Sequence, residues 1–338
     1  MNLRVLWFVL LGVLLAGYAV LDGFDLGVGI LHPGARDDRE RRIFMNSIGP
    51  LWDGNEVWLV TFGGALFAAF PEAYATAFSA FYPAFMILLC ALIFRAVSME
   101  FRSKRDSRVW RRAWDGAFFL SSLTAAVLFG AAVGDSMLGI PLTAAHEYAG
   151  GFWDLLRPYA LLVGALNAAM FAMHGAIYLH LKTEGELQRR VRRWMWHSFG
   201  VFLTLYLLTT IVTLIRVPRA IANFAEMPWL WGLVVAEVLA LANIPRSLYL
   251  RRSGQAFVSS TAAIAALVAL FGAALYPNLI VSSLDPAGTL TIANAASSQR
   301  TLGIMAFIAA AGLPFVLAYT AIIYWVFRGK VELGKFSY

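Results

Sequence analysis

Long apolar stretches recur along the whole chain. Nine of them approach or exceed the roughly 20 residues that an α-helix needs to cross a bilayer core of about 30 Å. They cover residues 5–31, 51–71, 76–99, 114–134, 157–181, 197–216, 228–249, 256–279 and 302–327. Only a short turn around Pro71 and Glu72 separates the second stretch from the third, so a count of eight also fits. The pattern predicts an all-α, polytopic membrane protein with one membrane domain over residues 1–338.

Composition supports this class, because 60% of the 338 residues are hydrophobic and only 14% are charged. The single cysteine, Cys90, lies within the third stretch, where we expect it to pack against other helices. One cysteine allows no internal disulfide and no cysteine-based metal or iron–sulfur site. The first stretch has no small-residue cleavage site after a short apolar core, so we expect a retained helix and not a signal peptide.

Basic residues alternate in density between successive connections. Of the 27 lysines and arginines, 22 fall in the segments 36–42, 95–112, 182–193, 246–252 and 328–335. With nine spans these segments all lie on one side, so the positive-inside rule predicts an N-terminus outside and a C-terminus in the cytoplasm. The net charge of +7 is then the sum of the inner loops, which suit anionic lipid head groups and require no nucleic acid as a partner.

Four carboxylates stand out against this apolar background. Asp22 and Asp25 lie inside the first stretch, and Asp53 and Glu56 open the second. The members of each pair are three residues apart, so each pair projects from one face of its helix. A charge at membrane depth costs about 2.5 to 3.5 kcal/mol on insertion scales and marks functional positions. With the expected orientation, all four acids line the cytoplasmic half of the membrane.

The first stretch also carries a seam of small residues at positions 12, 16, 19, 23 and 27. Such a seam lets a second helix approach closely. Asp22 lies beside this seam, so we expect its carboxylate to point into protein and away from lipid.

Two interpretations compete for the four acids. Acids in the first turn of a helix cap free N–H groups and oppose the helix dipole, and for Glu56 this is an equal alternative. Arg95 or Arg41 could also neutralise any of the four in a structural ion pair. Buried carboxylates without such a partner tend to become proton carriers, and a proton relay is our preferred interpretation for Asp22, Asp25 and Asp53.

The histidines give a weaker signal. His174 lies near the middle of the fifth stretch with Met170 and Met173 close by, and these residue types can ligate haem iron. No histidine lies four residues from another and no Cys-x-x-Cys-His motif exists, so a histidine bonded to a neighbouring helix is the commoner case. Glu237, inside the seventh stretch, has no partner that the sequence reveals.

Three strings are specific enough to carry a resemblance. Residues 17–29 read GYAVLDGFDLGVG, residues 46–61 read NSIGPLWDGNEVWLVT, and residues 63–71 read GGALFAAFP. Together with the segments 94–95, 101–104, 183–187, 276–278 and 294–298, they resemble subunit II of the cytochrome bd-type quinol oxidases over essentially the whole chain. The length fits the short form of that family, which includes the cyanide-insensitive oxidases, and the subtype stays open.

The resemblance implies two four-helix bundles plus one peripheral helix, in a bacterial cytoplasmic-membrane subunit that pairs with a similarly folded subunit I. It implies that subunit I ligates two haems b and one haem d and oxidises ubiquinol or another quinol, while this chain ligates no haem and no metal. Dioxygen would be reduced to water without a proton pump. A small single-helix subunit, bound lipid and a structural quinone stay open as further partners.

The resemblance also assigns residues. It implies a cytoplasmic proton path through Asp53, with Asp22, Asp25 and Glu56 near it, and no catalytic residue in this chain. The supporting motif comprises Trp52, Gly54, Asn55, Trp58 and Arg95. The main alternative is a proton- or ion-coupled transporter, since intramembrane acids beside glycine-interrupted helices also mark such sites. A transporter of that kind predicts an inverted repeat, and the sequence has none that we detect. A purely structural partner with static ion pairs is the third interpretation.

Overall fold

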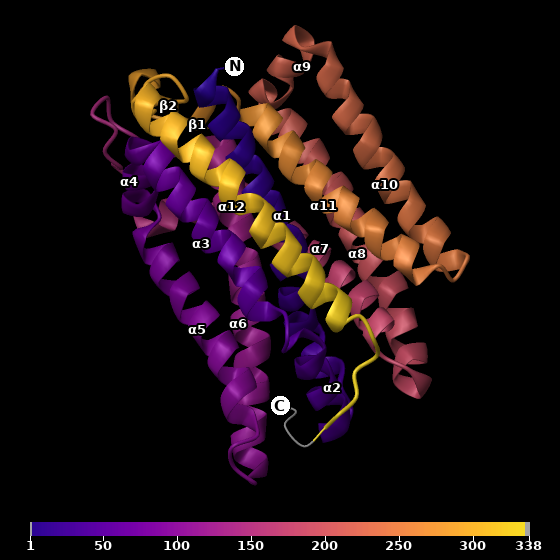
Figure 1. Ribbon diagram of the computed structural model, residues 1–338. Helices are drawn as coiled ribbons and strands as arrows, with labels where there is room; N and C mark the ends of the chain where they lie inside the picture. Colours follow the sequence, from indigo (N-terminus) through magenta and orange to yellow (C-terminus); the bar gives the residue numbers. More distant parts are fainter. Residues whose placement is uncertain (1, 335–338) are drawn as a thin grey trace.

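Long helices make up most of the molecule (Figure 1). The computed structural model describes residues 2–334. Its elements are α1 (Leu3–Leu31), α2 (Asp38–Ile48), α3 (Trp52–Ala69), α4 (Pro71–Ala80), α5 (Tyr82–Arg102), α6 (Arg108–Leu138), α7 (Pro158–Lys182), α8 (Gly185–Arg216), α9 (Ala222–Glu226), α10 (Trp231–Tyr249), α11 (Ser253–Leu275), β1 (Asn278–Ile280), β2 (Leu290–Thr291) and α12 (Gln299–Val326). The predicted all-α class is confirmed, with one two-stranded antiparallel sheet, β1–β2, added to it.

Several helix ends differ from the predicted spans. α6 and α8 begin earlier than predicted, because their first turns carry arginines, which form helix well but do not count as apolar. The predicted third span, 76–99, is wrong at its start, since residues 71–80 form the separate helix α4. Pro71 lies in the first turn of α4 and Pro83 in the first turn of α5. Proline is tolerated there because the first turn has no intrahelical partner for the missing N–H.

Eight helical segments are long and apolar enough to cross a membrane. They are Leu3–Gly34, Tyr82–Arg102, Arg108–Leu138, Pro158–Lys182, Gly185–Arg216, Pro228–Tyr249, Ser253–Leu275 and Gln299–Val326. α3 is not among them, because its polar first turns, with Asp53, Asn55 and Glu56, lower the hydropathy of the helix. It lies alongside α1 and α12 in Figure 1, so its role as a ninth span stays a prediction.

α1 lies at the centre of the molecule and contacts helices on two of its sides. On one side it packs against α3 and α6, and α5 packs on α6. On the other side it packs against α7 and α11, with α8 on α7 and α10 on α11. Apolar side chains cover the outside, as expected for a surface that meets lipid or another membrane subunit. Cys90 is exposed on α5, so our expectation that it packs against other helices is wrong.

The small-residue seam of α1 is confirmed at two of its positions. A Cβ added to Gly27 would lie 1.9 Å from the carbonyl oxygen of Phe171 on α7, and one added to Gly175 of α7 would lie 2.5 Å from the carbonyl carbon of Gly27. Gly23 faces the ring of Phe171 in the same way. Gly12 has no atom within 4 Å of such a Cβ, so the close contact covers only the second half of the seam.

His174 ties three helices together. Its Nε2 lies 3.2 Å from the carbonyl oxygen of Val20 on α1, and its Nδ1 lies 2.7 Å from the hydroxyl of Ser260 on α11. The imidazole stacks on Phe257 with ring centroids 4.8 Å apart. Both ring nitrogens of this fully buried histidine are therefore engaged in helix packing, which agrees with the commoner case expected from the sequence.

The end of the molecule opposite α2 is closed by two long connections, 139–157 and 276–298. They meet where Ile140 pairs with Ser282 beside the β1–β2 sheet. Arg157 Nη2 lies 2.6 Å from the carboxylate of Asp135 and 2.9 Å from the carbonyl oxygen of Gly139, which fixes the start of α7 against the end of α6. The sequence does not reveal that these two connections pair.

α12 is held mainly near its ends. Trp7 Nε1 donates to the carbonyl oxygen of Leu302, 3.0 Å away, at one end. At the other end, Lys182 Nζ donates to the carbonyl oxygen of Phe327, and Val331 N donates to that of Lys182, 3.0 Å away. Most side chains between these anchors are exposed. In Figure 1, α12 lies across the front of α1 and α3. The arrangement as two four-helix bundles plus one peripheral helix stays a prediction.

We expect Gly27→Ala to lower the unfolding free energy of the purified protein by about 1–3 kcal/mol, because overpacking forces the backbones of α1 and α7 apart. Gly12→Ala, on the same helix but facing open space, is the matched control. Thermal unfolding in detergent, followed by tryptophan fluorescence, measures both. Equal effects of the two substitutions would show that the contact of α1 with α7 does not depend on Gly27.

Candidate functional site, a buried cluster of acids around Arg95

A buried guanidinium organises the predicted acidic residues. Arg95 comes from α5 and is fully buried. Its Nη1 lies 2.6 Å from Asp22 Oδ1 of α1, and its Nη2 lies 3.2 Å from Glu56 Oε2 of α3. The Asp22 carboxylate is fully buried, whereas 23% of the Glu56 side chain is exposed. Of the two arginines considered from the sequence, Arg95 is the one that neutralises this cluster.

Asp25 belongs to the same cluster but forms no ion pair with any residue that the structure describes. Asn55 Nδ2 donates to Asp25 Oδ2 at 2.8 Å and lies 3.2 Å from the carbonyl oxygen of Leu21. The hydroxyl of Tyr324, on α12, donates to Asn55 Oδ1 at 2.8 Å. Asn55 therefore connects α1, α3 and α12, and it holds Asp25 with a neutral hydrogen bond that leaves the charge of the carboxylate unpaired.

Several polar atoms of the cluster have no protein partner within residues 2–334. They are Tyr18 OH, Asp22 Oδ2, Asp25 Oδ1 and Arg95 Nε, all buried. An unpartnered buried polar group costs about 1–3 kcal/mol, so four in one place are unusual for a purely structural cluster. The interior of this site can accept or donate further hydrogen bonds.

Asp53 lies apart from these buried acids, exposed on the outer face of α3. The same face carries Val57, Val60 and Phe67, which are 50%, 70% and 59% exposed. Gly54 is open as well, with no atom within 4 Å of an added Cβ. Asp53 is thus a carboxylate on an otherwise apolar, uncovered helix face.

The two tryptophans of the motif have packing roles in this chain. An added Cβ on Gly17 would lie 2.3 Å from the indole of Trp58, so Trp58 holds α3 against α1. Trp52 packs at the edge of the apolar cluster that contains Phe24, Phe44 and Ile48. These contacts place Asn55 and Glu56 toward α1 and leave Asp53 on the opposite side.

The sequence did not single out two members of the site. Tyr18 lies one turn before Asp22 on the same face of α1, so helical spacing could have found it. Tyr324 comes from the last apolar stretch, some 270 residues after Asn55, and nothing in the sequence around it signals the contact.

Glu237 is fully buried in α10, and neither carboxylate oxygen has a partner in the described part of the chain.

A second charged cluster lies at the basic end of the molecule. Asp115 of α6 accepts from Arg102 Nε at 2.6 Å and from Arg41 Nη1 at 2.8 Å, and it lies 2.7 Å from His32 Nε2. Arg41 is therefore occupied here and does not reach the acids of α1. His32 is buried at the end of α1 against this group. Among residues 2–334, no group of three or more His, Cys, Asp and Glu side chains could hold a metal ion.

Comparison with known proteins decides the family. Residues 3–327 match the family described as cytochrome bd terminal oxidase subunit II. The chain belongs to this family. Among its relatives, subunit 2 of the cytochrome bd-I ubiquinol oxidase of Escherichia coli K12 is 37% identical over 97% of this chain and 95% of its own length. Subunit 2 of the cytochrome bd ubiquinol oxidase of Bacillus subtilis 168 is 35% identical over 98% of this chain and 97% of its own length.

A solved structure supports the fold of this bd oxidase subunit II. A chain of the bd oxidase from Geobacillus thermodenitrificans superposes with a TM-score of 0.81, covering 97% of this chain and 99% of its own length at 20% identity. The resemblance expected from the sequence is thus confirmed, and the transporter alternative is set aside. The chain is subunit II of a bd-type terminal oxidase and a multi-pass protein of the bacterial cytoplasmic membrane.

We expect Asp22→Asn to destabilise the subunit by about 3–5 kcal/mol, because it leaves the buried guanidinium of Arg95 without its closest counter-charge. Glu56→Gln is the matched control, since it removes the longer and partly exposed contact of the same guanidinium. Thermal unfolding of the purified oxidase measures both. If Asp22→Asn proved no more harmful than Glu56→Gln, Arg95 would not depend on Asp22.

Proposed function

We propose that this subunit supports the assembly of the haem-bearing subunit I and delivers protons to its oxygen-reducing site. The observation that carries the proposal is the position of Asp53 on an exposed, otherwise apolar face of α3. A carboxylate at membrane depth is too costly to face lipid tails, so this face is best explained as the surface that meets another subunit. Asp53 is then the residue that passes protons across the subunit boundary.

The buried acids behind Asp53 supply the path. Glu56 is one helical turn from Asp53 and reaches from the partly exposed surface to Arg95. Asp25 can hold and release a proton, because among residues 2–334 its hydrogen-bond donor is the neutral amide of Asn55. Asp22 is paired with Arg95, so we assign it a fixed negative charge that balances the guanidinium.

The unpartnered polar atoms of the cluster support this assignment. Proton transfer over more than one hydrogen-bond length needs donors and acceptors that are free to pair with water or with one another. Tyr18 OH, Asp22 Oδ2 and Asp25 Oδ1 are three such groups in one place. A static ion-pair cluster would leave fewer of them unsatisfied.

The charge pattern sets the direction of the path. The acids lie in the half of the molecule toward the basic connections, which the positive-inside rule places in the cytoplasm. Protons used to reduce dioxygen to water would enter from that side, while quinol oxidised at the outer side of subunit I would release its protons there. The oxidase would thereby build a membrane potential without pumping.

We further propose that this chain ligates none of the haems, two of type b and one of type d, which subunit I would hold. Both nitrogens of His174 are engaged, one with Val20 and one with Ser260, so neither is available to iron in this arrangement. The quinol, ubiquinol or another quinone species, would bind to subunit I. A small single-helix subunit, lipid and a structural quinone are compatible further partners.

Asp53→Asn is expected to slow oxygen consumption by about tenfold or more and to slow the build-up of potential in proteoliposomes, because the amide keeps the shape but cannot exchange a proton. The Michaelis constant for quinol should stay unchanged, since the quinol site lies on subunit I. Asp154→Asn, on a connection at the opposite end, is the matched control. If Asp53→Asn kept full oxygen consumption and built up a normal membrane potential, the role of Asp53 would be helix capping and not proton transfer. Failure to assemble would make it a structural residue.

We also expect the isolated chain to show no reduced-minus-oxidised haem spectrum, whereas the complex with subunit I shows all three haems. Purifying each and comparing their absorbance in the Soret region makes the test. A haem spectrum from the isolated chain that is lost in His174→Ala would contradict the assignment of all haems to subunit I.

A further inference from the structure

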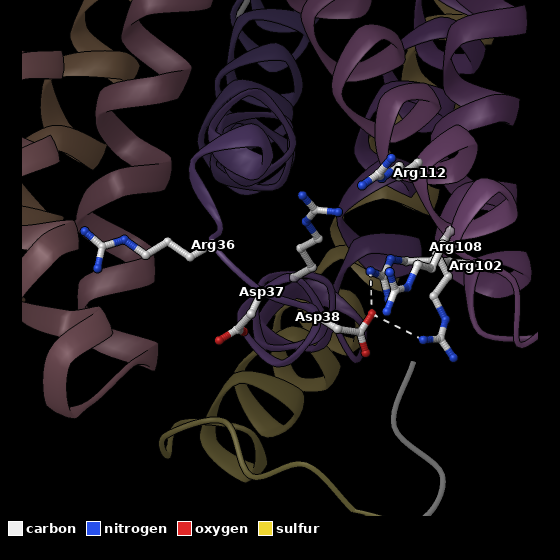
Figure 2. Close-up of a pocket in the computed structure, with 8 residues that line it drawn as sticks. Arg36, Asp37, Asp38, Arg102, Arg108 and Arg112 are labelled. Atoms are coloured by element: carbon white, nitrogen blue, oxygen red, sulfur yellow. Dashed lines mark hydrogen bonds and ion pairs between the residues drawn. The ribbon is translucent and has the colours of Figure 1, made fainter.

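An open cavity of about 500 Å³ lies at the basic end of the molecule, between α2 and the junction of α5 with α6. Arginines dominate its lining, which consists of Arg36, Asp37, Asp38, Arg41, Arg102, Arg108, Arg111 and Arg112. Figure 2 shows these side chains. Six arginines against two aspartates leave a large excess of positive charge around one space.

The acids of the cavity are already occupied. Asp38 lies 2.9 Å from Arg102 Nη2 and 3.9 Å from Arg111 Nη1. Asp37 Oδ1 accepts from the backbone N–H of Glu40 at 2.9 Å and so caps α2. Beneath the cavity, Asp115 pairs with Arg41 and Arg102. These carboxylates neutralise part of the lining and hold its arginines in place.

Several guanidinium N–H groups of the cavity have no acceptor in the described part of the chain. Two are buried, Arg102 Nη1, on a residue only 1% exposed, and Arg41 Nε. The side chains of Arg108 and Arg112 are exposed, make no ion pair or hydrogen bond with residues 2–334, and lie on the same side as Arg102 in Figure 2. A buried guanidinium N–H without an acceptor is costly, so the buried groups in particular favour an anion as their partner. Arg36 extends away from these residues and does not belong to this group of arginines.

Two helix N-termini add to the positive potential. α2 begins at Asp38 and α6 begins at Arg108, so both helices direct the positive end of their dipoles at the cavity. Backbone N–H groups at such ends favour phosphate and similar anions. The helix ends and the arginines thus select the same charge.

The cavity also lies at the level of a membrane surface. α6 has 31 residues and is about 46 Å long at about 1.5 Å per residue, well beyond what a bilayer core requires. Its first turns carry Trp110 and Trp114, the residue type that gathers at the interface of lipid with water. A group held by Arg108 and Arg112 would therefore lie at head-group depth.

We propose that this cavity binds a phosphate group, carried either by an anionic phospholipid or by a soluble phosphate. Phosphate fits because it offers several acceptor oxygens to guanidinium groups that approach from different helices, and arginine binds it with two parallel hydrogen bonds. The site is independent of the proton path and of the haems, and its failure would leave the proposed function untouched.

The test uses the whole oxidase, stripped of lipid and returned to phosphatidylcholine nanodiscs with added phosphatidylglycerol. Native mass spectrometry counts the phosphatidylglycerol that stays bound. A second arm titrates the lipid-free oxidase with inorganic phosphate and follows thermal stability. Both arms compare the wild type with Arg108→Gln/Arg112→Gln, with Arg108→Lys/Arg112→Lys, and with the control Arg189→Gln/Arg193→Gln, which removes two exposed arginines of α8 from the same end of the molecule.

We expect the glutamine pair at 108 and 112 to weaken phosphatidylglycerol binding by about thirtyfold, as the loss of two arginines near a membrane surface implies. The lysine pair should keep most of the binding, and the control should keep all of it. Haem content and melting temperature of each variant establish that it has folded. Stabilisation of the lipid-free wild type by inorganic phosphate, with no phosphatidylglycerol retained in the nanodisc arm, would identify a soluble phosphate as the occupant.

Three results would overturn the site. One is that the variant Arg108→Gln/Arg112→Gln binds phosphatidylglycerol and inorganic phosphate as strongly as the wild type does. Another is an equal loss in the α8 control, which would reduce the effect to general surface charge. The last is that the wild type binds neither phosphatidylglycerol nor phosphate, in which case the arginines form a solvated or protein-covered face.

Discussion

A guanidinium buried at membrane depth must be neutralised where it stands, and this requirement shapes the centre of the subunit. Arg95 on α5 is fully buried, and its counter-charges come from α1 and α3. Removing Asp22 would leave the guanidinium without its closest counter-charge, with only the longer contact to the partly exposed Glu56. The three helices are therefore bound to one another by electrostatics in addition to packing, and the acids are brought within reach of each other as a result. The carboxylates and the guanidinium that form the candidate site therefore also hold these three helices together.

α1 transmits this constraint to the rest of the molecule. Its acids face α3 and α5, while Gly23 and Gly27 let α7 approach on another side. His174 then connects α1 with α11 through α7. One helix thus meets a polar surface on one side and a closely packed backbone on the other, which explains why small residues and carboxylates alternate so densely between Gly17 and Gly29.

Much of this fold follows from the sequence, and the limits have physical reasons. Hydropathy located the spans because the outward side chains are apolar. It missed the early starts of α6 and α8, where helix continues into water. Spacing placed Asp22 with Asp25 and Asp53 with Glu56 on common faces, but it could not choose between Arg95 and Arg41, since ion-pair partners are set by helix packing. Spacing also did not reveal that Asp53 is exposed while Asn55, two residues later, is buried. The contact of Tyr324 with Asn55 depends on a helix far along the chain, which local spacing cannot predict. The oxidase function came from the resemblance of the motifs, since buried acids alone also fit a transporter.

The anchoring of α12 has a consequence for when the acidic cluster around Arg95 can form during synthesis. Its anchors lie on α1, α3 and α7, all of which precede it in the chain, and its middle makes few contacts of its own. Tyr324, near its far end, completes the support of Asn55 and through it the setting of Asp25. During synthesis the acidic cluster therefore stays unfinished until this last described helix has been made and has docked. A chain without α12 would carry every carboxylate of the site yet lack the Tyr324 hydroxyl, so the hydrogen-bonded setting of Asp25 depends on the docking of α12.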